Sequence, residues 1–243
     1  MARRLKPRRE RPTATPTRET KPQQMRGSCD DYAMDEHEIQ RVLDFWFTDC
    51  QRDAPNIDAR MDRWFGSDTS LDDQIRDSFA GLVERAASGE LDDWCQTPHG
   101  RLALIILLDQ FPRNIHRGQA GAYAHDRKAL EICVEGTVNG DYKKLLAEQQ
   151  LFFFMPLQHA ESRKIQTKSV SVYRALANRV SETLRETFNT AAQFAELHHD
   201  IIAEFGRFPH RNEVLGRENT PAEAEYLSSD APTFGQEQTM ESA

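Results

Sequence analysis

The chain has 243 residues, 38% of them hydrophobic, which is enough for one substantial core. Its 39 acidic and 31 basic residues give a net charge of −8, which argues against a general nucleic-acid-binding surface on the folded part. The sequence shows neither a secretory signal nor an apolar stretch long enough to cross a bilayer, so we expect a cytoplasmic protein that does not enter a membrane.

A basic, proline-rich stretch opens the chain. Residues 1–26 hold nine Arg or Lys and two Glu, a net charge of +7, which leaves −15 for the rest. The stretch has four prolines and almost no apolar residues, so it cannot bury enough surface to offset the entropy lost on ordering. We expect residues 1–33 to form a disordered tail. Its role stays open between a solvated extension, a weak contact with nucleic acid or the nuclear-import machinery, and an organelle-targeting segment.

Beyond the tail, apolar residues recur at helical spacing almost throughout. Ile39, Val42, Leu43 and Trp46 fall at i, i+3, i+4 and i+7, and Asp35 stands where an N-cap is expected. Glycines and prolines then mark the ends of further segments. We expect helices at about 57–65, 70–88, 97–110, 120–138, 141–154, 161–188 and 190–205, and a last one that begins with the capping box Thr220-Pro221-Ala222-Glu223.

The helix that begins at Thr97-Pro98 should lie at the centre of the fold. Its body, Leu102–Leu108, is apolar on every side, which is typical of a helix surrounded by others. No window alternates apolar and polar residues between turn signals, so we predict no significant sheet. The expected fold is all-α: a compact irregular bundle of about eight or nine antiparallel helices in one domain over 34–235, followed by a disordered end at 236–243.

Cysteines and metal-ligand residues form no recognisable motif. Four cysteines are scattered without a C-x-x-C pair, as in a reduced intracellular protein. No H-E-x-x-H or similarly close ligand spacing occurs, and we predict no metal site. A Gly-rich phosphate loop and a G-x-S-x-G motif are also missing, so the sequence identifies no cofactor and no familiar covalent chemistry.

Two passages are nearly the same: Phe111-Pro112-Arg113-Asn114 and Phe208-Pro209-His210-Arg211-Asn212, each directly after a predicted helix. The aromatic residue and the proline fix a turn that holds an arginine and an asparagine close to the helix end. Arginine offers a rigid fork of donors, and asparagine offers both a donor and an acceptor, which suits an anionic or amide-bearing ligand. The alternative is that both passages only cap and brace helix ends.

Asp109 and Gln110 stand directly before the first passage. A carboxylate at the predicted C-terminal end of a helix opposes the helix dipole, so Asp109 requires a compensating charge. The nearest cations in the sequence are Arg113 and Arg117. An aspartate with two arginines forms either a structural ion-pair cluster or part of a substrate site.

Two histidines are candidates for proton transfer. His159 follows Pro156, which should end a helix, and Glu161 lies at the start of the next one. The two form an acid/base pair, or the helix dipole alone explains the glutamate. His198 falls four residues after Phe194 on the buried face of its helix, where a histidine is either a hydrogen-bonded core group or part of a site.

These motifs together resemble the DUF924 family of uncharacterised proteins over roughly residues 36–234. The resemblance implies an all-helical fold related to the tetratricopeptide-like superfamily, and it implies no established reaction. Gln158 and Ala160, which flank His159, depart from residues common in relatives. The matching motifs are Leu43-Asp44-Phe45-Trp46-Phe47, Arg63-Trp64-Phe65, Thr97-Pro98, Leu107 to Asn114 with Arg117-Gly118, Met155-Pro156 with His159 and Glu161, His198 with Ile201-Ile202, Phe205 to Asn212, and Leu215-Gly216-Arg217.

Two hypotheses about function follow, and the sequence leaves open whether the protein is an enzyme. In the first, a pocket binds a small anionic molecule or peptide through Asp109, Gln110, Arg113, Asn114, Arg117, Arg207, His210, Arg211 and Asn212, with His159, Glu161 or His198 handling a proton. In the alternative, the domain is a protein or peptide interaction module without catalytic activity. The first hypothesis requires the two Phe-Pro passages to lie together around Asp109, His159 and His198. The sequence identifies no oligomeric state.

Overall fold

The computed structural model describes residues 29–47, 61, 63–66, 68–229, 232 and 234 of the chain. Within these residues all regular structure is helical and no strand occurs, so the predicted all-α class is confirmed. The predicted tail and the predicted C-terminal segment 236–243 lie outside the described residues, apart from the first residues of helix α1. No described helix is long and apolar enough to span a membrane.

The first two helices begin earlier than the sequence pattern suggests. Helix α1 (Cys29–Trp46) starts before Asp35, the predicted N-cap, because residues 29–38 contain neither proline nor glycine to interrupt it. Helix α3 (Thr69–Ser88) is capped by Asp68, whose side chain accepts a hydrogen bond from the Ser70 backbone N–H. It ends at Gly89 in the left-handed conformation, as predicted.

The central helix is confirmed, and it is fully enclosed. Helix α4 (Pro98–Ile105) begins where Thr97 accepts a hydrogen bond from the Gly100 N–H. All side chains from Leu102 to Leu108 are completely buried. These residues pack against helices on several sides, which explains why this run has no polar face.

The helix does not end before Phe111, as the sequence suggests, but continues through a π-helical turn. This segment, η2 (Ile106–Gln110), leads directly into α5 (Phe111–Ile115), and the Phe111 N–H donates to the Ile106 carbonyl five residues earlier. One extra residue in the turn lets Pro112, which has no N–H, enter the first turn of α5 without leaving the helical path. Asp109 therefore lies inside a π turn, and not at a helix end.

Short elements follow and then two long helices. The predicted helix over 161–188 is wrong: α9 ends at Ala177, and α10 runs unbroken across 188–190. Residues 163–205 contain neither glycine nor proline, so neither of the residues that most often end a helix marks the turn at 178–181, and Ser181, the N-cap of α10, was not recognised. The elements are η3 (Ala120–Tyr123), α6 (Asp126–Asn139), η4 (Asp141–Lys144), α7 (Ala147–Phe153), α8 (Met155–His159), α9 (Arg163–Ala177) and α10 (Glu182–Phe205).

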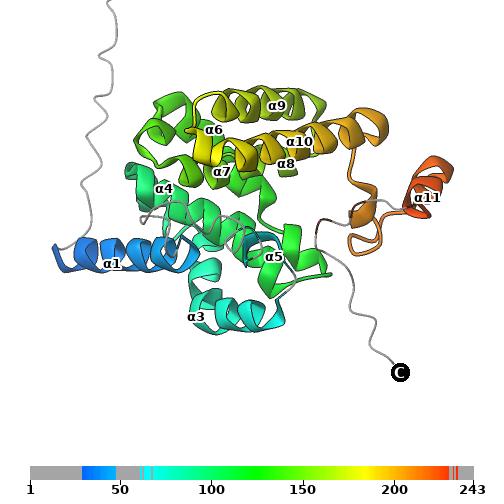
Figure 1. Ribbon diagram of the computed structural model, residues 1–243. Helices are drawn as coiled ribbons and strands as arrows, with labels where there is room; N and C mark the ends of the chain where they lie inside the picture. The colour runs from blue at the N-terminus through cyan, green and yellow to red at the C-terminus, as the bar shows by residue number, and fades with distance from the viewer. Residues whose placement is uncertain are drawn as a thin grey trace, which may run out of the picture.

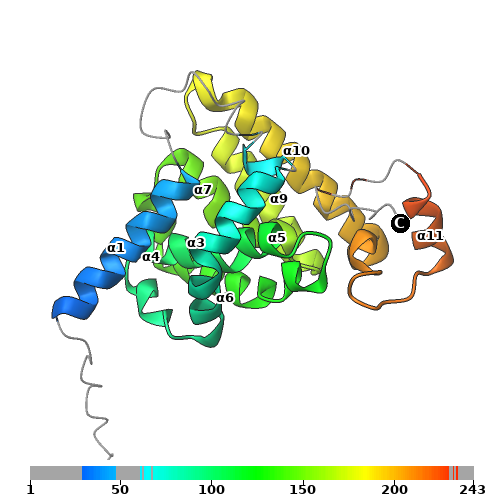
Figure 2. The ribbon, with the colours of Figure 1, turned by 90° about the horizontal axis from the view of Figure 1, so that it is seen from below.

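Helices α9 and α10 form an antiparallel pair that covers one side of the bundle (Figure 1). On the other side, α1 packs against α4 and α3 packs against α5. The view from below shows α10 extending past this body toward α11 (Pro221–Leu227), which stands apart at that end (Figure 2). The predicted capping box of Thr220 and Glu223 opens α11.

Between α10 and α11 lies the second Phe-Pro passage, in a short helical turn, η5 (Pro209–Arg211). Gly206 ends α10 in the left-handed conformation, so the chain reverses there and brings Phe208 against Ile201 and Ile202. The predicted turn at this passage is confirmed. It places His210 and Arg211 beside the region where α5 and α8 meet the rest of the bundle.

Candidate functional site

A buried carboxylate lies at the centre of the site. Asp109 is fully buried, and its carboxylate contacts His159 Nδ1 at 2.8 and 3.0 Å and accepts a hydrogen bond from Gln110 Nε2 at 2.5 Å. Arg113 donates to its backbone oxygen and lies 3.3 Å from Oδ1. Burial alone would raise its pKa, but Arg113 and His159 outweigh burial and lower the pKa of Asp109 to about 2.

The ionised carboxylate fixes the protonation of His159. Because Asp109 can only accept, the proton of the neutral imidazole lies on Nδ1, and Nε2 keeps its lone pair. Burial, together with the nearby Arg113, lowers the pKa of His159, while Asp109 opposes this shift. No hydrogen bond between described residues uses Nε2, so this atom is available to a molecule in the adjoining pocket.

Asp126 joins the two Phe-Pro passages. Arg113 lies 3.0 Å from its carboxylate, and Arg211 Nη1 donates to the same carboxylate at 3.1 Å. Arg211 also donates to the His159 backbone oxygen at 3.3 Å. Both guanidinium groups lie over the ring of Tyr123, at 5.7 Å for Arg113 and 4.5 Å for Arg211. The arginines of the two passages therefore lie together beside Asp109 and His159, as the first hypothesis requires.

The asparagines of the passages have other partners. Asn114 donates to Asp72 Oδ1 at 2.7 Å, and Arg117 binds both oxygens of the same carboxylate at 2.7 and 2.8 Å. These two residues border the pocket while they connect α5 to α3. Asn212 donates to Asn219 at 2.7 Å and does not line the pocket.

Glu161 and Arg207, two further predicted site residues, do not reach the pocket. The carboxylate of Glu161 accepts from Arg217 at 2.8 and 3.1 Å and from the Phe208 N–H at 2.8 Å, so it holds the second passage in place. Arg207 pairs with Glu223 at 2.6 and 2.7 Å at the start of α11. Both side chains connect segments of the fold.

Two more histidines line the pocket. His198, on α10, donates from Nδ1 to the Phe194 carbonyl at 2.7 Å, and its ring centroid lies 6.2 Å from that of His159. Burial, followed by the effect of His159, lowers the pKa of His198 to about 3. Burial, followed by Arg211, lowers the pKa of His210 to about 3. Both rings are therefore neutral at neutral pH.

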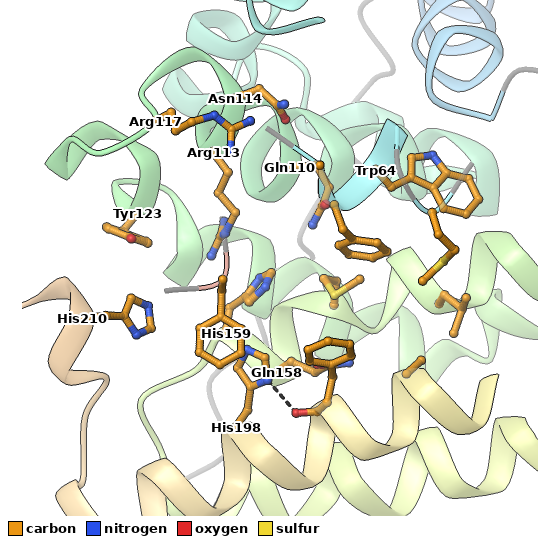
Figure 3. Close-up of a pocket in the computed structure, with 18 of the residues that line it drawn as sticks. Trp64, Gln110, Arg113, Asn114, Arg117, Tyr123, Gln158, His159, His198 and His210 are labelled. Atoms are coloured by element: carbon orange, nitrogen blue, oxygen red, sulfur yellow. Dashed lines mark hydrogen bonds between the residues drawn. The ribbon is translucent and has the colours of Figure 1, made fainter. Parts of the chain in front are cut away.

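The pocket lined by His159, His198, His210, Arg113 and Arg211 has a volume of about 380 Å³ and is drawn in Figure 3. Arg113 points down toward His159 in that view, while Trp64 and His210 lie on opposite sides. None of the lining residues among those described is Ser, Thr or Cys. The arginine and amide side chains of the lining can form hydrogen bonds, and its histidines can exchange protons. In the described part of the chain, no three His, Cys, Asp or Glu side chains are grouped as metal ligands.

Sequence reasoning missed several residues that line the pocket or hold its arginines. Tyr123, which lines the pocket, and Asp126, which pairs with its arginines, lie in a stretch with no motif, and Trp64 was named only within the motif Arg63-Trp64-Phe65. A turn at Gln119–Tyr123 that presents an aromatic ring next to a helix-starting Asp is the single local signal. The other lining residues outside the prediction are Met61, Phe65, Gly66, Leu151, Met155, Gln158, Tyr173, Ala191, Phe194 and Phe234.

Comparisons with known proteins identify relatives without a known activity. Residues 42–231 match the family described as "Bacterial protein of unknown function (DUF924)". A solved structure, that of the protein of unknown function ATU0120 from Agrobacterium tumefaciens, is 34% identical and superimposes with a TM-score of 0.67, covering 79% of this chain and 97% of that one. No curated protein matches the chain. The chain belongs to the DUF924 family.

Proposed function

We propose that the protein binds a small anionic molecule in the pocket and that His159 exchanges a proton with it. One observation carries the proposal: the fully buried carboxylate of Asp109 contacts Nδ1 of His159, and no hydrogen bond between described residues uses Nε2 of this ring, which lines the pocket. A carboxylate in this position favours the tautomer that carries its proton on Nδ1. It also stabilises the imidazolium that forms when the ring accepts a second proton. The role of His159 is that of a general base or acid.

The anionic character of the ligand is supported by buried nitrogen atoms without a partner, one of them on an arginine. Arg211 lines the pocket and is 5% exposed, and its Nε has no hydrogen-bond partner among the described residues. His210 Nδ1 is also buried without a partner among the described residues, and it is a donor in the tautomer that carries the proton on this atom. Buried donors without acceptors are costly, and a carboxylate or phosphate oxygen would satisfy them.

These observations favour the ligand site over the interaction module. An interaction module without catalytic activity needs its recognition residues on an exposed face. Here the polar residues of the two passages are mostly buried, and Arg113, Asn114, His210 and Arg211 line one pocket. Buried polar groups of this kind suit a small molecule that enters the pocket.

The binding test uses benzoate, octanoate and inorganic phosphate as probes in a thermal-shift assay with the full chain. At least one of these anions should raise the melting temperature of the wild type, because binding to the native state stabilises it. Arg211→Lys keeps the positive charge but loses the forked set of donors of the guanidinium group. It should raise the dissociation constant of the anion by about 10- to 100-fold. Arg174→Lys, at a pair with Glu196 outside the pocket, is the matched control. No shift with any probe would overturn the proposal.

The proton-transfer test measures the protons exchanged on binding, from calorimetry in two buffers of different ionisation enthalpy. The wild type should exchange protons with a bound anion, and His159→Gln should bind without this exchange, because glutamine can donate to Asp109 but does not titrate. His199→Gln, on a histidine that contacts Asp200 outside the pocket, should behave as the wild type. Equal proton exchange in His159→Gln and the wild type would contradict the role of His159.

A further inference from the structure

The pocket has two chemically different ends. In Figure 3, Trp64 lies on one side and His210 on the opposite side, with His159 between them. The side of His210 carries arginine and histidine, whereas the side of Trp64 is formed mainly by carbon. A ligand that fills the pocket must match both ends.

Two aromatic lining residues already use their polar atoms inside the protein. Trp64 donates from Nε1 to the Trp46 carbonyl at 2.9 Å, and the Tyr173 hydroxyl donates to the Leu151 carbonyl at 2.7 Å. These residues therefore offer only their rings to the pocket. Met61 and Met155 also line the pocket, and their unbranched side chains adapt to the shape of an apolar group.

Two exposed aromatic side chains line the same pocket. Phe65 is 50% exposed and Phe194 is 45% exposed, although both contribute to the lining. An aromatic ring left open to water beside a cavity is apolar surface that a bound molecule can cover. The two rings thus give the pocket apolar surface that is open to solvent.

The charges that surround the pocket favour a head group with one negative charge over a head group with two. The three arginines of the pocket are each paired with an aspartate: Arg113 with Asp109 and Asp126, Arg211 with Asp126, and Arg117 with Asp72. Two buried nitrogen atoms have no partner among the described residues, Arg211 Nε and His210 Nδ1. Arg211 Nε is a donor, and His210 Nδ1 donates in the tautomer that carries the proton on this atom. Two hydrogen bonds suit the two oxygens of one carboxylate, whereas a dianion would bring twice the negative charge to a buried place whose arginines are already matched by aspartates.

We infer that the ligand is an amphipathic monocarboxylate: its carboxylate binds at Arg211 and His210, and its aliphatic or aromatic part lies between Trp64 and Phe194. This inference rests on the proposed function and adds the chemical class of the ligand. His159 then faces the carbon atoms next to the carboxylate, since the ring lies between the two ends of the pocket (Figure 3).

The test is a calorimetric series of butyrate, hexanoate and octanoate with the full chain. Each methylene buried at the apolar end should tighten binding about fourfold, so Kd should fall by roughly 15-fold with each two-carbon extension. Octanamide, which keeps the tail but lacks the charge, should bind at least about tenfold more weakly than octanoate.

Two variants locate the tail. Phe194→Ser should raise the Kd of octanoate by about tenfold and leave that of butyrate unchanged, because only the longer chain reaches the ring. Leu197→Ser is the matched control, since Leu197 is exposed on the same helix but does not line the pocket. A melting curve of each variant shows whether it is folded, and Phe65→Ser serves in place of Phe194→Ser if the latter is not.

The outcomes separate this inference from the proposed function. If all three acids bind with the same Kd, or if Phe194→Ser and Leu197→Ser behave alike, the apolar part of the inference is wrong while the anion site stands. If octanamide binds as tightly as octanoate, the carboxylate assignment is wrong. If octanoate fails to bind while phosphate binds, the ligand class is wrong and the proposed function stands; if no probe binds, both are wrong.

Discussion

Asp109 is the residue on which the polar half of the site depends. Its carboxylate is the common contact of His159, Gln110 and Arg113 inside the core. A buried charge of this kind is tolerated only while its partners are present. If the aspartate is replaced, each partner in turn loses its contact with the carboxylate. The residue therefore contributes to both stability and the protonation of His159.

We predict that Asp109→Asn lowers the free energy of unfolding by about 3 kcal/mol at neutral pH, because it removes one charge of a buried pair. The pKa of Asp109 is lowered in the folded protein, so this contribution is present above the ordinary value of 3.8 and is lost as pH falls toward about 2. Urea denaturation at neutral pH measures the difference.

The control for this variant is Asp73→Asn on α3. Asp73 contacts Arg76, but both side chains are largely exposed, so the change should stay within about 0.5 kcal/mol. If the two asparagine variants lose the same small amount, the carboxylate of Asp109 does not have the structural role that its contacts indicate.

At this scale the sequence predicted some partners and missed others. Asp109 was selected because a carboxylate near a predicted helix end requires a cation, and Arg113, four residues later, is that cation. Arg117 was the other candidate, but it pairs with Asp72, 45 residues earlier. A pair made by folding across that separation leaves no periodic or local signal in the sequence.

Among the elements, α4 and α6 pack unusually closely at Gly136. A Cβ atom there would lie 2.2 Å from Cδ of Arg101 and 2.9 Å from Cζ of Phe153. Arg101 cannot move aside easily, because its guanidinium binds the Ile132 and Cys95 carbonyls and Asp141. The glycine thus allows a buried arginine to pass between two helices.

We predict that Gly136→Ala destabilises the protein by about 1–3 kcal/mol, because overpacking against Arg101 outweighs the better helix propensity of alanine. Gly81→Ala on α3 is the matched control, since nothing lies within 4 Å of its added Cβ. That variant should instead stabilise the protein by about 0.5–1 kcal/mol. Chemical denaturation measures both, and the same sign for the two variants would contradict the close packing at Gly136.

The sequence predicted elements well where a residue changes the backbone directly. Thr97, Gly89 and the box at Thr220 mark the ends that the structure shows. The π turn at 106–110 and the turn at 178–181 contain no glycine, and no side chain there forms a cap hydrogen bond. In the first case a proline inside a continuous helix resembles a helix end, and in the second the apolar pattern continues across the turn.

At the level of the whole molecule, the bundle keeps several imidazoles out of water. Burial lowers the pKa of His198 and of His210 from 6.5 to about 3, and burial also lowers the pKa of His159. The all-α class followed from sequence periodicity alone, but this convergence of histidines from α8, α10 and η5 depends on how the helices pack. Packing joins segments that the sequence separates.

We predict that the protein loses stability as pH falls from about 6.5 toward about 3. The folded-state pKa of His198 and His210 is below the ordinary value, so in this window the unfolded chain binds more protons and folding becomes less favourable on acidification. Each of the two histidines contributes a slope of about 1.4 kcal/mol per pH unit. Denaturation curves across this range measure the slope.

Replacing the histidines identifies their share of this effect. His198→Gln and His210→Gln should each reduce the slope, and the double variant should reduce it further, because glutamine does not titrate. Parallel curves for the wild type and the double variant would contradict the neutral, buried state of these rings. Above pH 6.5 the contribution of protonation should be nearly constant.

The carboxylate of Asp126, shared by Arg113 and Arg211, has a consequence for the order in which the chain folds. Arg211 reaches back 85 residues to this contact and 52 residues to the His159 carbonyl. Contacts between residues so far apart in the sequence form late in folding, after other interactions have offset the entropy cost of closing the loop. During synthesis, a growing chain acquires Asp109 and His159 well before Arg211, so ligand capture must wait until the C-terminal residues have emerged and docked.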